Sequence, residues 1–287
     1  MIFRHRNLAV RVIVRACALV AAVHSGTAEA AARPAPLRAL LVLGGCCHDY
    51  MAQQELLKNG IEARANVSVD VVFSADTSTK PPLAIYGNPK YADGYDVVIH
   101  DECASDIKDP AVVEGVLAPH KAGIPGVNLH CGVHCYRIMP DPKVPVTPGS
   151  TESLWIDYLG VQSSGHGKQL PVAIVFTDKK HPTVNGMADW TTVNEELYNN
   201  IVVRDATHVI ARGSQEPNDK PNFTEAAVVW TNEYGDKKTR VFSTTIGHKS
   251  DTVGDARYLD LVTRGVLWAC GKLQDSGKPA DGFGPAN

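Results

Sequence analysis

Residues 124–137 combine side chains that can bind metals, carry protons or attack an electrophile. A short apolar run ends there in a polar group that contains His130, Cys131, His134 and Cys135. A neutral imidazole is both a metal ligand and a proton carrier near neutral pH, and a cysteine beside a histidine can act as a nucleophile. Because His130 and His134 are four residues apart, they would share one face if both were helical. Metal binding, acid–base catalysis and nucleophilic catalysis are therefore the chemistries to consider for this segment.

Cys131 does not occupy the position that a nucleophile would take in a strand-to-helix elbow. There the reactive residue lies at the strained turn and has small neighbours. His130, with Gly132 two residues later, fits that position, and Cys131 follows it. His130 is therefore the predicted centre of the site, and Cys131 and Cys135 are predicted to be structural thiols. For His134, a role beside the site is favoured over direct ligation.

Polar side chains also follow other predicted strands. His48 lies three residues after a Gly-Gly pair, Glu102 lies at the tip of a third strand, and His248 follows a late strand. Each has a structural alternative: a loop histidine for His48, a loop cap for Glu102, and the cap region of the last helix for His248. The sharper hypothesis makes His48 and His248 site residues and Glu102 a general base or metal ligand.

Two adjacent carboxylates, Glu195 and Glu196, precede Tyr198 in a segment predicted to be a short helix or turn. One of the two carboxylates is expected to point inward. His181 lies in an irregular polar segment, where a purely structural role is the alternative.

Alternating strands and helices are predicted to bring these residues together. This alternation is typical of a parallel, doubly wound α/β sheet with helices on both faces. In such a sheet the carboxyl ends of the strands lie at one edge, so residues 46–49, 101–103 and 130–134 should converge. The predicted strands are 37–43, 67–73, 95–100, 126–129, 172–176 and 206–211, a hairpin of 226–231 and 240–245 is expected, and the helices are 51–59, 109–121 and 255–273.

The first thirty residues have the pattern of a secretory signal. Arginines and a histidine precede the apolar residues 16–23, and Ala28-Glu29-Ala30 is an A-x-A cleavage signal. Residues 1–30 are therefore predicted to be a signal peptide, 31–273 a single domain and 274–287 a flexible tail, and the mature protein is expected to be periplasmic or secreted. A retained membrane anchor is the alternative.

Charge and motifs exclude several function classes. The formal net charge of the 287 residues is -3, and no basic run follows the leader, so nucleic acid and membrane surfaces are not expected partners. The glycines at 44–45 lack the spacing of a nucleotide-binding loop, and no G-x-S-x-G elbow of a serine hydrolase is present. The sequence does not exclude that the protein associates with copies of itself into a homo-oligomer.

Six of the seven cysteines follow the leader. In an oxidising compartment disulfides are expected, but spacing does not fix their connectivity. One bridge is expected among Cys46 or Cys47, Cys103 and Cys135, and buried free thiols are the alternative. The partners of Cys131 and Cys270 are not predicted.

An ordered set of short motifs resembles the trehalose-utilisation (ThuA-like) family over about residues 38–272. The set comprises Gly44-Gly45 with His48, Gly126-x-x-Leu129-His130-x-Gly132, His181-Pro182-x-x-x-Gly186, Asn194-Glu195-x-x-Tyr198, Val229-Trp230-Thr231 and Gly247-His248. The resemblance implies a flavodoxin-like fold of the class I glutamine amidotransferase type. It also implies a link to the catabolism of sugars, including oxidised keto-sugars.

The resemblance implies a polar pocket built from His48, His130, Glu195 and His248, with His181 nearby and with a divalent metal, zinc or manganese. True amidotransferases carry Gly-Ile-Cys-x-Gly at the elbow, whereas here a histidine replaces the nucleophile. Amide transfer is therefore not expected unless Cys131 compensates by a shift in register.

Three hypotheses remain. The first is an exported enzyme, a metal-dependent hydrolase or lyase, that acts on a carbohydrate derivative. Its metal ligands are His48, His130 and His248. Its catalytic residues are His130, Glu195 and Glu102, and its substrate-binding residues are Tyr198, His181 and Arg137. The second is a non-catalytic carbohydrate-binding protein in which Trp155, Trp190 or Tyr198 stacks on the sugar. The third is an amidotransferase-like enzyme that uses Cys131.

Overall fold

The computed structural model describes residues 1–2, 33–215 and 225–286. The predicted signal peptide lies outside these residues except for its first two. Within the described part of the chain, no helix is long and apolar enough to cross a membrane.

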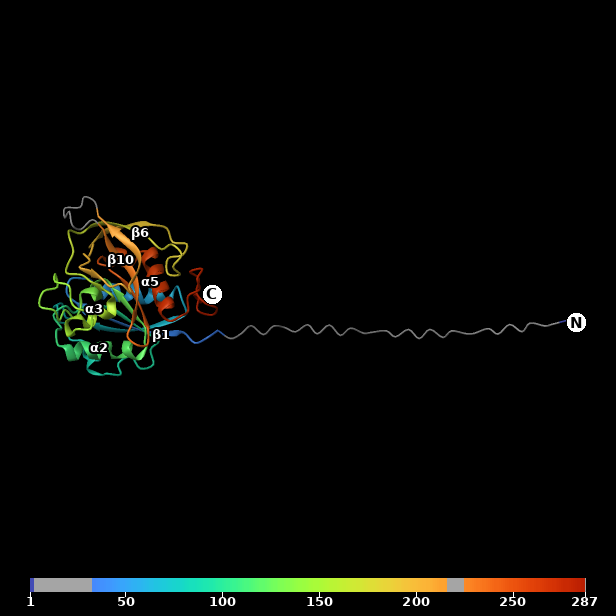
Figure 1. The fold of residues 1–287 in the computed structure, drawn as a ribbon, viewed down its shortest axis with the longest axis horizontal. Helices are drawn as coiled ribbons and strands as arrows, with labels where there is room; N and C mark the ends of the chain where they lie inside the picture. Colours follow the sequence, from blue (N-terminus) through green and yellow to red (C-terminus); the bar gives the residue numbers. More distant parts are fainter. Residues whose placement is uncertain (3–32, 216–224, 287) are drawn as a thin grey trace. The chain divides into compact units, whose positions relative to one another are not determined.

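One large sheet forms the centre of the domain (Figure 1). Its nine strands lie in the order β2-β1-β3-β4-β11-β10-β9-β6-β7. The strands are β2 (Val67–Ser74), β1 (Leu37–Gly45), β3 (Val97–Cys103), β4 (Gly126–Leu129), β11 (Thr239–Thr244), β10 (Ala226–Tyr234), β9 (His208–Ser214), β6 (Leu170–Phe176) and β7 (Trp190–Glu195). The first five strands of this order, from β2 at the edge to β11, are parallel to one another. From β11 to the other edge strand, β7, neighbouring strands are antiparallel. A separate pair joins β5 (Val161–Gln162) to β8 (Val202–Val203).

Helices cover both faces of the sheet, as the alternating pattern predicted. The residues of β1 and β3 are almost all buried, so these strands read as continuous apolar runs. On one face lie α1 (Tyr50–Glu62), α4 (Ser250–Val253) and α5 (Ala256–Ala269), and on the other lie α2 (Pro110–Ala122) and α3 (Leu154–Leu159). The short 3-10 turns are η1 (Ala84–Gly87), η2 (His130–His134) and η3 (Thr151–Ser153).

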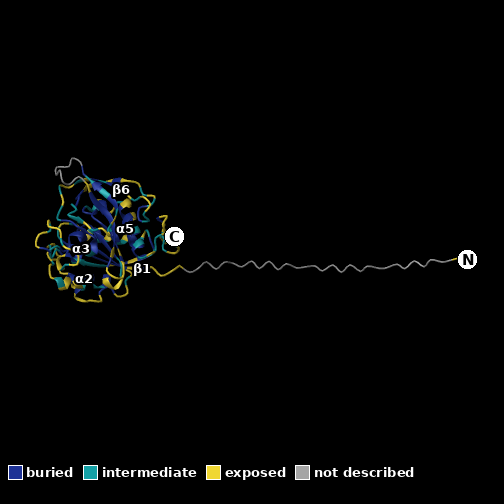
Figure 2. Ribbon diagram, in the orientation of Figure 1, coloured by how far each residue is buried: buried dark blue, intermediate teal, exposed yellow. Residues whose placement is uncertain are grey.

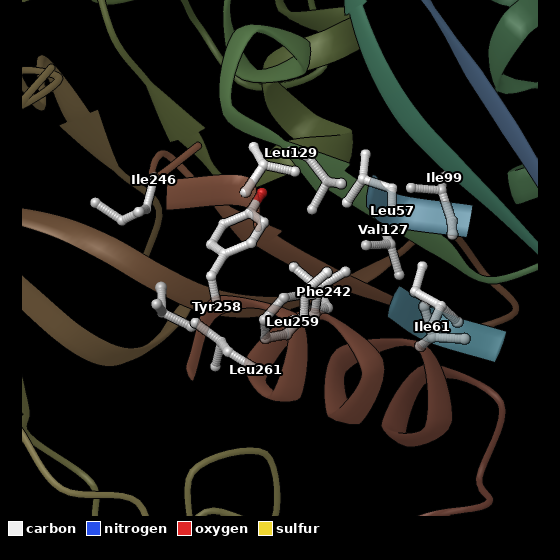
Figure 3. Close-up of a cluster of buried hydrophobic side chains, with 14 of the residues drawn as sticks. Leu57, Ile61, Ile99, Val127, Leu129, Phe242, Ile246, Tyr258, Leu259 and Leu261 are labelled. Atoms are coloured by element: carbon white, nitrogen blue, oxygen red, sulfur yellow. The ribbon is translucent and has the colours of Figure 1, made fainter. Parts of the chain in front are cut away.

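The core on the α1/α5 face joins the two helices to the parallel strands. In Figure 3, Tyr258 and Leu259 of α5 lie beside Leu129 and Phe242 of the sheet, and Leu57 of α1 lies next to Val127. Figure 2 shows the buried residues gathered in the strands and inner helix faces, with exposed residues along the loops. Burial of this apolar surface fixes the ends of the strands that carry the polar residues.

Four parallel strands end at the same edge and carry the candidate residues. Strand β1 has β2 on one side and β3 on the other, so the order of the sheet reverses at β1. In open α/β sheets, ligands bind outside the carboxyl ends of the strands at such a switch point. His48 follows β1, Cys103 ends β3, His130 follows β4, and His248 follows β11. The predicted convergence at this edge is confirmed by the strand order.

Three local expectations differ from the structure. His130 begins a five-residue 3-10 turn and not a longer helix. Residues up to Glu195 belong to edge strand β7, and no helix follows them before β8. The tail is also not free, because the Asn66 amide donates to the Phe283 carbonyl and Phe283 packs against the core. The glycines and prolines of residues 274–287, which suggested a flexible tail, lie in turns that pack against the domain.

Candidate functional site

A pocket of about 520 Å³ lies at the carboxyl ends of the parallel strands. Its wall contains side chains from the turn after β1, the end of β3, the η2 elbow, the loop after β5 and the turn after β11. Polar lining residues include His48, His134, Arg137, His166, Gln169, Glu196, Tyr198 and His248, and four cysteines complete one side. A pocket of this size is typical of small-molecule sites.

The structure brings His48, His130 and His248 together, although the sequence separates them widely. The His48 ring centroid lies 4.7 Å from that of His130 and 4.7 Å from that of His248, and the latter two lie 5.4 Å apart. One ring nitrogen from each residue lies within 4.8 Å of the others. Such a group of three could hold a metal ion.

The backbone at the elbow is shaped to present His130. Its φ of 38° is in the left-handed region, which non-glycine residues seldom adopt. Gly132 is needed because a Cβ there would lie 2.7 Å from the His100 carbonyl oxygen. Backbone strain of this kind is often found at functional sites.

His130 is buried and is not among the residues that line the pocket, and its hydrogen bonds distinguish its two ring nitrogens. Nδ1 lies 2.6 Å from the carbonyl oxygen of Thr245, so it must donate a proton to that oxygen. Nε2 then carries the lone pair and lies 3.2 Å from the Tyr198 hydroxyl. A carbonyl that orients the far nitrogen is a common support for a metal-binding histidine.

Glu196 is the carboxylate that faces the histidines. Its Oε2 lies 3.5 Å from His130 Nε2 and 3.4 Å from His166 Nε2, and its Oε1 lies 3.4 Å from His248 Nδ1. Burial raises the pKa of Glu196, but the three surrounding rings outweigh it and lower the pKa to about 2. The side chain is therefore an ionised carboxylate at neutral pH.

Glu195, which the motif indicated as the catalytic carboxylate, points the other way. It is fully buried and accepts hydrogen bonds from the backbone N–H groups of His248 and Lys249, at 2.9 and 3.0 Å. Neighbouring residues of an extended strand project to opposite sides, so only one of two adjacent glutamates can enter the pocket. Glu195 positions the turn that carries His248, and the carboxylate assignment moves to Glu196.

Glu102 lies outside the pocket. It is fully buried on the α2 side of the sheet, where it accepts hydrogen bonds from Tyr86 at 2.9 Å and Tyr136 at 2.6 Å and contacts His100 at 3.0 Å. Strand alternation again explains the placement, because the next residue, Cys103, takes the pocket side. The expected role of Glu102 as a proton carrier is therefore not supported by its position.

His181 is also remote from the pocket wall. Its Nδ1 lies 2.8 Å from the Thr183 hydroxyl, and its ring lies beside Trp268 of α5, with 5.6 Å between centroids. The structural alternative for His181 describes this placement better than substrate binding does.

Tyr198 and Arg137 do line the pocket. The Tyr198 ring stacks on His134, with centroids 3.8 Å apart, and His134 in turn lies 2.8 Å from the Ser163 hydroxyl. His134 itself lines the pocket, and the role beside the site that the sequence favoured for it stays a prediction. Arg137 donates to the Ser163 carbonyl at 3.3 Å, and burial lowers the pKa of its guanidinium.

His166, Gln169 and Glu196 were not predicted as site residues. His166 and Gln169 belong to the loop after β5, which has no periodic pattern to place it. Gln169 Nε2 lies 2.9 Å from His248 Nε2 and donates to Glu196 at 3.1 Å. The available signal was the pair of adjacent glutamates, one of which was expected to face inward.

The cysteines are paired differently from the expectation. Disulfides join Cys46 to Cys47 and Cys103 to Cys131, and Cys135 is a buried free thiol. The thiol of Cys135 donates to the Glu102 carbonyl at 2.9 Å and accepts from the Ala104 amide at 3.1 Å. Cys131 is thus neither a free structural thiol nor placed to act as an amidotransferase nucleophile.

The three histidines fit a divalent metal. Burial, together with His130 and His248, lowers the pKa of His48 to about 2, so its ring is neutral as ligation requires. His248 Nδ1 is buried and lacks a hydrogen-bond partner among the described residues. Three protein ligands that leave an open position are typical of catalytic zinc.

Comparison with known proteins gives a matching family and structures with a similar fold. The model of the trehalose-utilisation family, ThuA, matches residues 38–269. The fold resembles a ThuA-like protein from Parabacteroides merdae (TM-score 0.61, 18% identity, 88% of this chain and 98% of that chain). It also resembles a ThuA-like protein from Bacteroides uniformis (TM-score 0.58, 15% identity, 84% and 94%). The comparison with curated proteins gave no match.

Proposed function

This chain belongs to the trehalose-utilisation family, and on that premise we propose that it is an enzyme that acts on a sugar or keto-sugar derivative in the His/Glu pocket. The family membership supports a role connected with carbohydrates. The observation that carries the enzymatic part is the ionised Glu196, placed 3.4–3.5 Å from three imidazoles in a pocket that can admit a small molecule.

In this proposal His48, His130 and His248 hold a divalent metal, zinc or manganese. When bound there, such an ion would supply Lewis-acid polarisation of a sugar carbonyl or hydroxyl. The protein's contribution is to orient the rings. The Thr245 carbonyl accepts a hydrogen bond from Nδ1 of His130, and Glu195 holds the backbone at His248.

Glu196 would accept the proton that the reaction releases from the substrate. An ionised carboxylate can take up a proton, and Glu196 then has His166, which is not among the proposed metal ligands, 3.4 Å away to share it. This arrangement suits a lyase, in which the carboxylate takes a proton from a C–H or O–H group of the substrate, or a hydrolase, in which it takes the proton from the attacking water.

Tyr198 and Arg137 would orient the substrate. The Tyr198 hydroxyl lies 3.2 Å from His130 Nε2 and so adjoins the reacting atoms. The half-buried guanidinium of Arg137 offers donors to sugar hydroxyls or to a carboxyl group of an oxidised sugar.

A non-catalytic sugar-binding role has less support. Stacking on a sugar needs an exposed aromatic face, but Trp155 is buried and donates to the Gly132 carbonyl at 2.9 Å. Trp190 is also buried, and Arg257 covers its ring at 4.6 Å. Neither tryptophan lines the pocket.

We further propose that the protein is periplasmic or secreted. The leader pattern of residues 1–30 supports export, and two disulfides in the described residues suit an oxidising compartment. The proposed partner is a small carbohydrate, with no nucleotide, nucleic acid or membrane.

A substrate screen tests the proposed function. The metal-loaded protein is incubated with a panel of disaccharides and their keto derivatives, and products are followed by NMR. We expect turnover of at least one keto-sugar, abolished in Glu196→Gln and retained in His181→Gln, a matched control outside the pocket. Turnover that survives in Glu196→Gln, or binding of a sugar without any turnover, would contradict the proposal.

A further inference from the structure

Four cysteines form one side of the pocket, and their disulfides touch. Cys46 and Cys47 lie in the turn after β1, Cys103 ends β3, and Cys131 is in the elbow next to His130. The Sγ atoms of Cys46 and Cys103, which belong to different disulfides, are 3.5 Å apart. A sulfur of one bridge is therefore in contact with a sulfur of the other.

The bridges differ in access. Cys47 is exposed and Cys46 is partly exposed, whereas Cys103 and Cys131 are both 5% exposed. A thiol that enters from solvent meets the Cys46–Cys47 bridge first. The Cys103–Cys131 bridge is almost closed to solvent and contacts the first bridge through Cys46.

The Cys46–Cys47 bridge is a poor structural crosslink. A disulfide stabilises a fold mainly by closing a loop of the unfolded chain, and the effect grows with loop length. This bridge joins residues separated by one position and so closes almost no loop. Strand β3, which ends at Cys103, is already joined by parallel pairing to β4, which ends two residues before Cys131. A chemical role accounts for the arrangement better than a stabilising one.

We propose that these four cysteines form a thiol–disulfide exchange site that accepts electrons from a small dithiol. One thiolate of the dithiol attacks the sulfur of Cys47, and Cys46 leaves as a thiolate. The second thiol of the dithiol then attacks its own mixed disulfide, which releases Cys47 as a thiol and the dithiol as a cyclic disulfide.

The electrons then pass inward. The Cys46 thiolate attacks the neighbouring sulfur of Cys103, so a Cys46–Cys103 bond forms and the Cys103–Cys131 bond breaks, with Cys131 as the leaving thiolate. In total the dithiol loses two electrons and two protons, and one of the two protein disulfides is reduced. The protons finish on Cys47 and Cys131. The outcome is a reduced Cys131 beside His130, reached through an exposed entry point.

The first test follows the inner bridge kinetically. The oxidised full chain is treated with dithiothreitol in the presence of EDTA, quenched in acid, alkylated with N-ethylmaleimide and digested with trypsin. The three tryptic peptides to follow are 39–58, 91–108 and 122–137. Without Cys46 as relay, the Cys46→Ser variant should open the Cys103–Cys131 bridge at least about tenfold more slowly than the unmodified chain. The control Cys270→Ser, whose thiol lies outside the pocket wall, should match the unmodified chain.

The second test traps the intermediate. In Cys47→Ser/Cys131→Ser, only Cys46 and Cys103 of the four remain, and mild oxidation should crosslink peptides 39–58 and 91–108. Equal opening rates in Cys46→Ser and the unmodified chain, or the absence of this crosslink in the folded double variant, would overturn the proposal. Neither test uses a sugar or a bound metal, so the result is independent of the proposed function.

Discussion

Two adjacent glutamates have different tasks in this site. Glu196 faces the histidines from within the pocket, whereas Glu195 holds the His248 turn through two backbone N–H groups. The sequence indicated that one carboxylate would point inward, but the choice between them depends on where strand β7 ends. A shift by one residue reverses the side on which each carboxylate lies.

Substitution separates the two roles. Glu196→Gln keeps the shape of the side chain but removes the proton acceptor, so turnover should fall by about 100-fold or more while stability changes little. Glu195→Gln replaces one of two buried acceptor oxygens with a donor and should lower the free energy of unfolding by about 2 kcal/mol. Denaturant unfolding and product formation measure the two effects. The assignment fails if Glu195→Gln abolishes turnover at full stability while Glu196→Gln remains active.

At the scale of elements, the elbow between β4 and η2 depends on a small residue. Gly132 approaches the His100 carbonyl so closely that a Cβ would lie 2.7 Å from its oxygen. This contact brings η2 against β3 and so sets the position of His130.

Gly132→Ala should therefore destabilise the fold by about 1–3 kcal/mol through overpacking. Gly167→Ala is the matched control, because a Cβ there would meet no atom within 4 Å. Thermal and urea unfolding of both variants give the comparison. Equal stability of the two variants would show that the elbow tolerates a wider turn than the structure implies.

A buried histidine at the end of α2 links the fold to pH. Burial, together with His100, lowers the pKa of His120 from 6.5 to about 3. Below pH 6.5 the unfolded chain takes up a proton that the folded chain does not, so stability falls as the pH decreases toward 3.

His120→Gln removes this proton. Between roughly pH 4 and 6, the slope of the unfolding free energy against pH should decrease by about 1.4 kcal/mol per pH unit relative to the unmodified chain. Urea titrations at several pH values measure the slope. An unchanged slope would mean that His120 is protonated in the folded state.

At the scale of the whole molecule, the sequence predicted the frame better than the site. Strands β1 and β3 were recognisable because burial on both faces gives continuous apolar runs, and the hairpin of β10 and β11 followed from the turn at Gly235. Edge strand β7 was not predicted. Convergence of His48 and His130 followed from the rule that parallel strands end at one edge, whereas the place of His248 beside them was implied by the family resemblance.

What could not be predicted depends on loops and on long-range contacts. His166 and Gln169 reach the pocket from a loop without periodicity, and the sides taken by Glu102 and Glu195 depend on exact strand register. The pairing of Cys103 with Cys131 also requires the distance between two strand ends, which spacing along the chain does not encode.

The central claim is that distant segments of the fold assemble His48, His130 and His248 into one metal site. The direct measurement is the affinity for zinc or manganese by isothermal titration calorimetry on the metal-stripped chain, with metal content checked by mass spectrometry. We expect one ion per chain, and an affinity at least about 100-fold weaker in His130→Ala, with His181→Ala unchanged. Absence of binding by the unmodified chain, or full affinity in His130→Ala, would contradict the account.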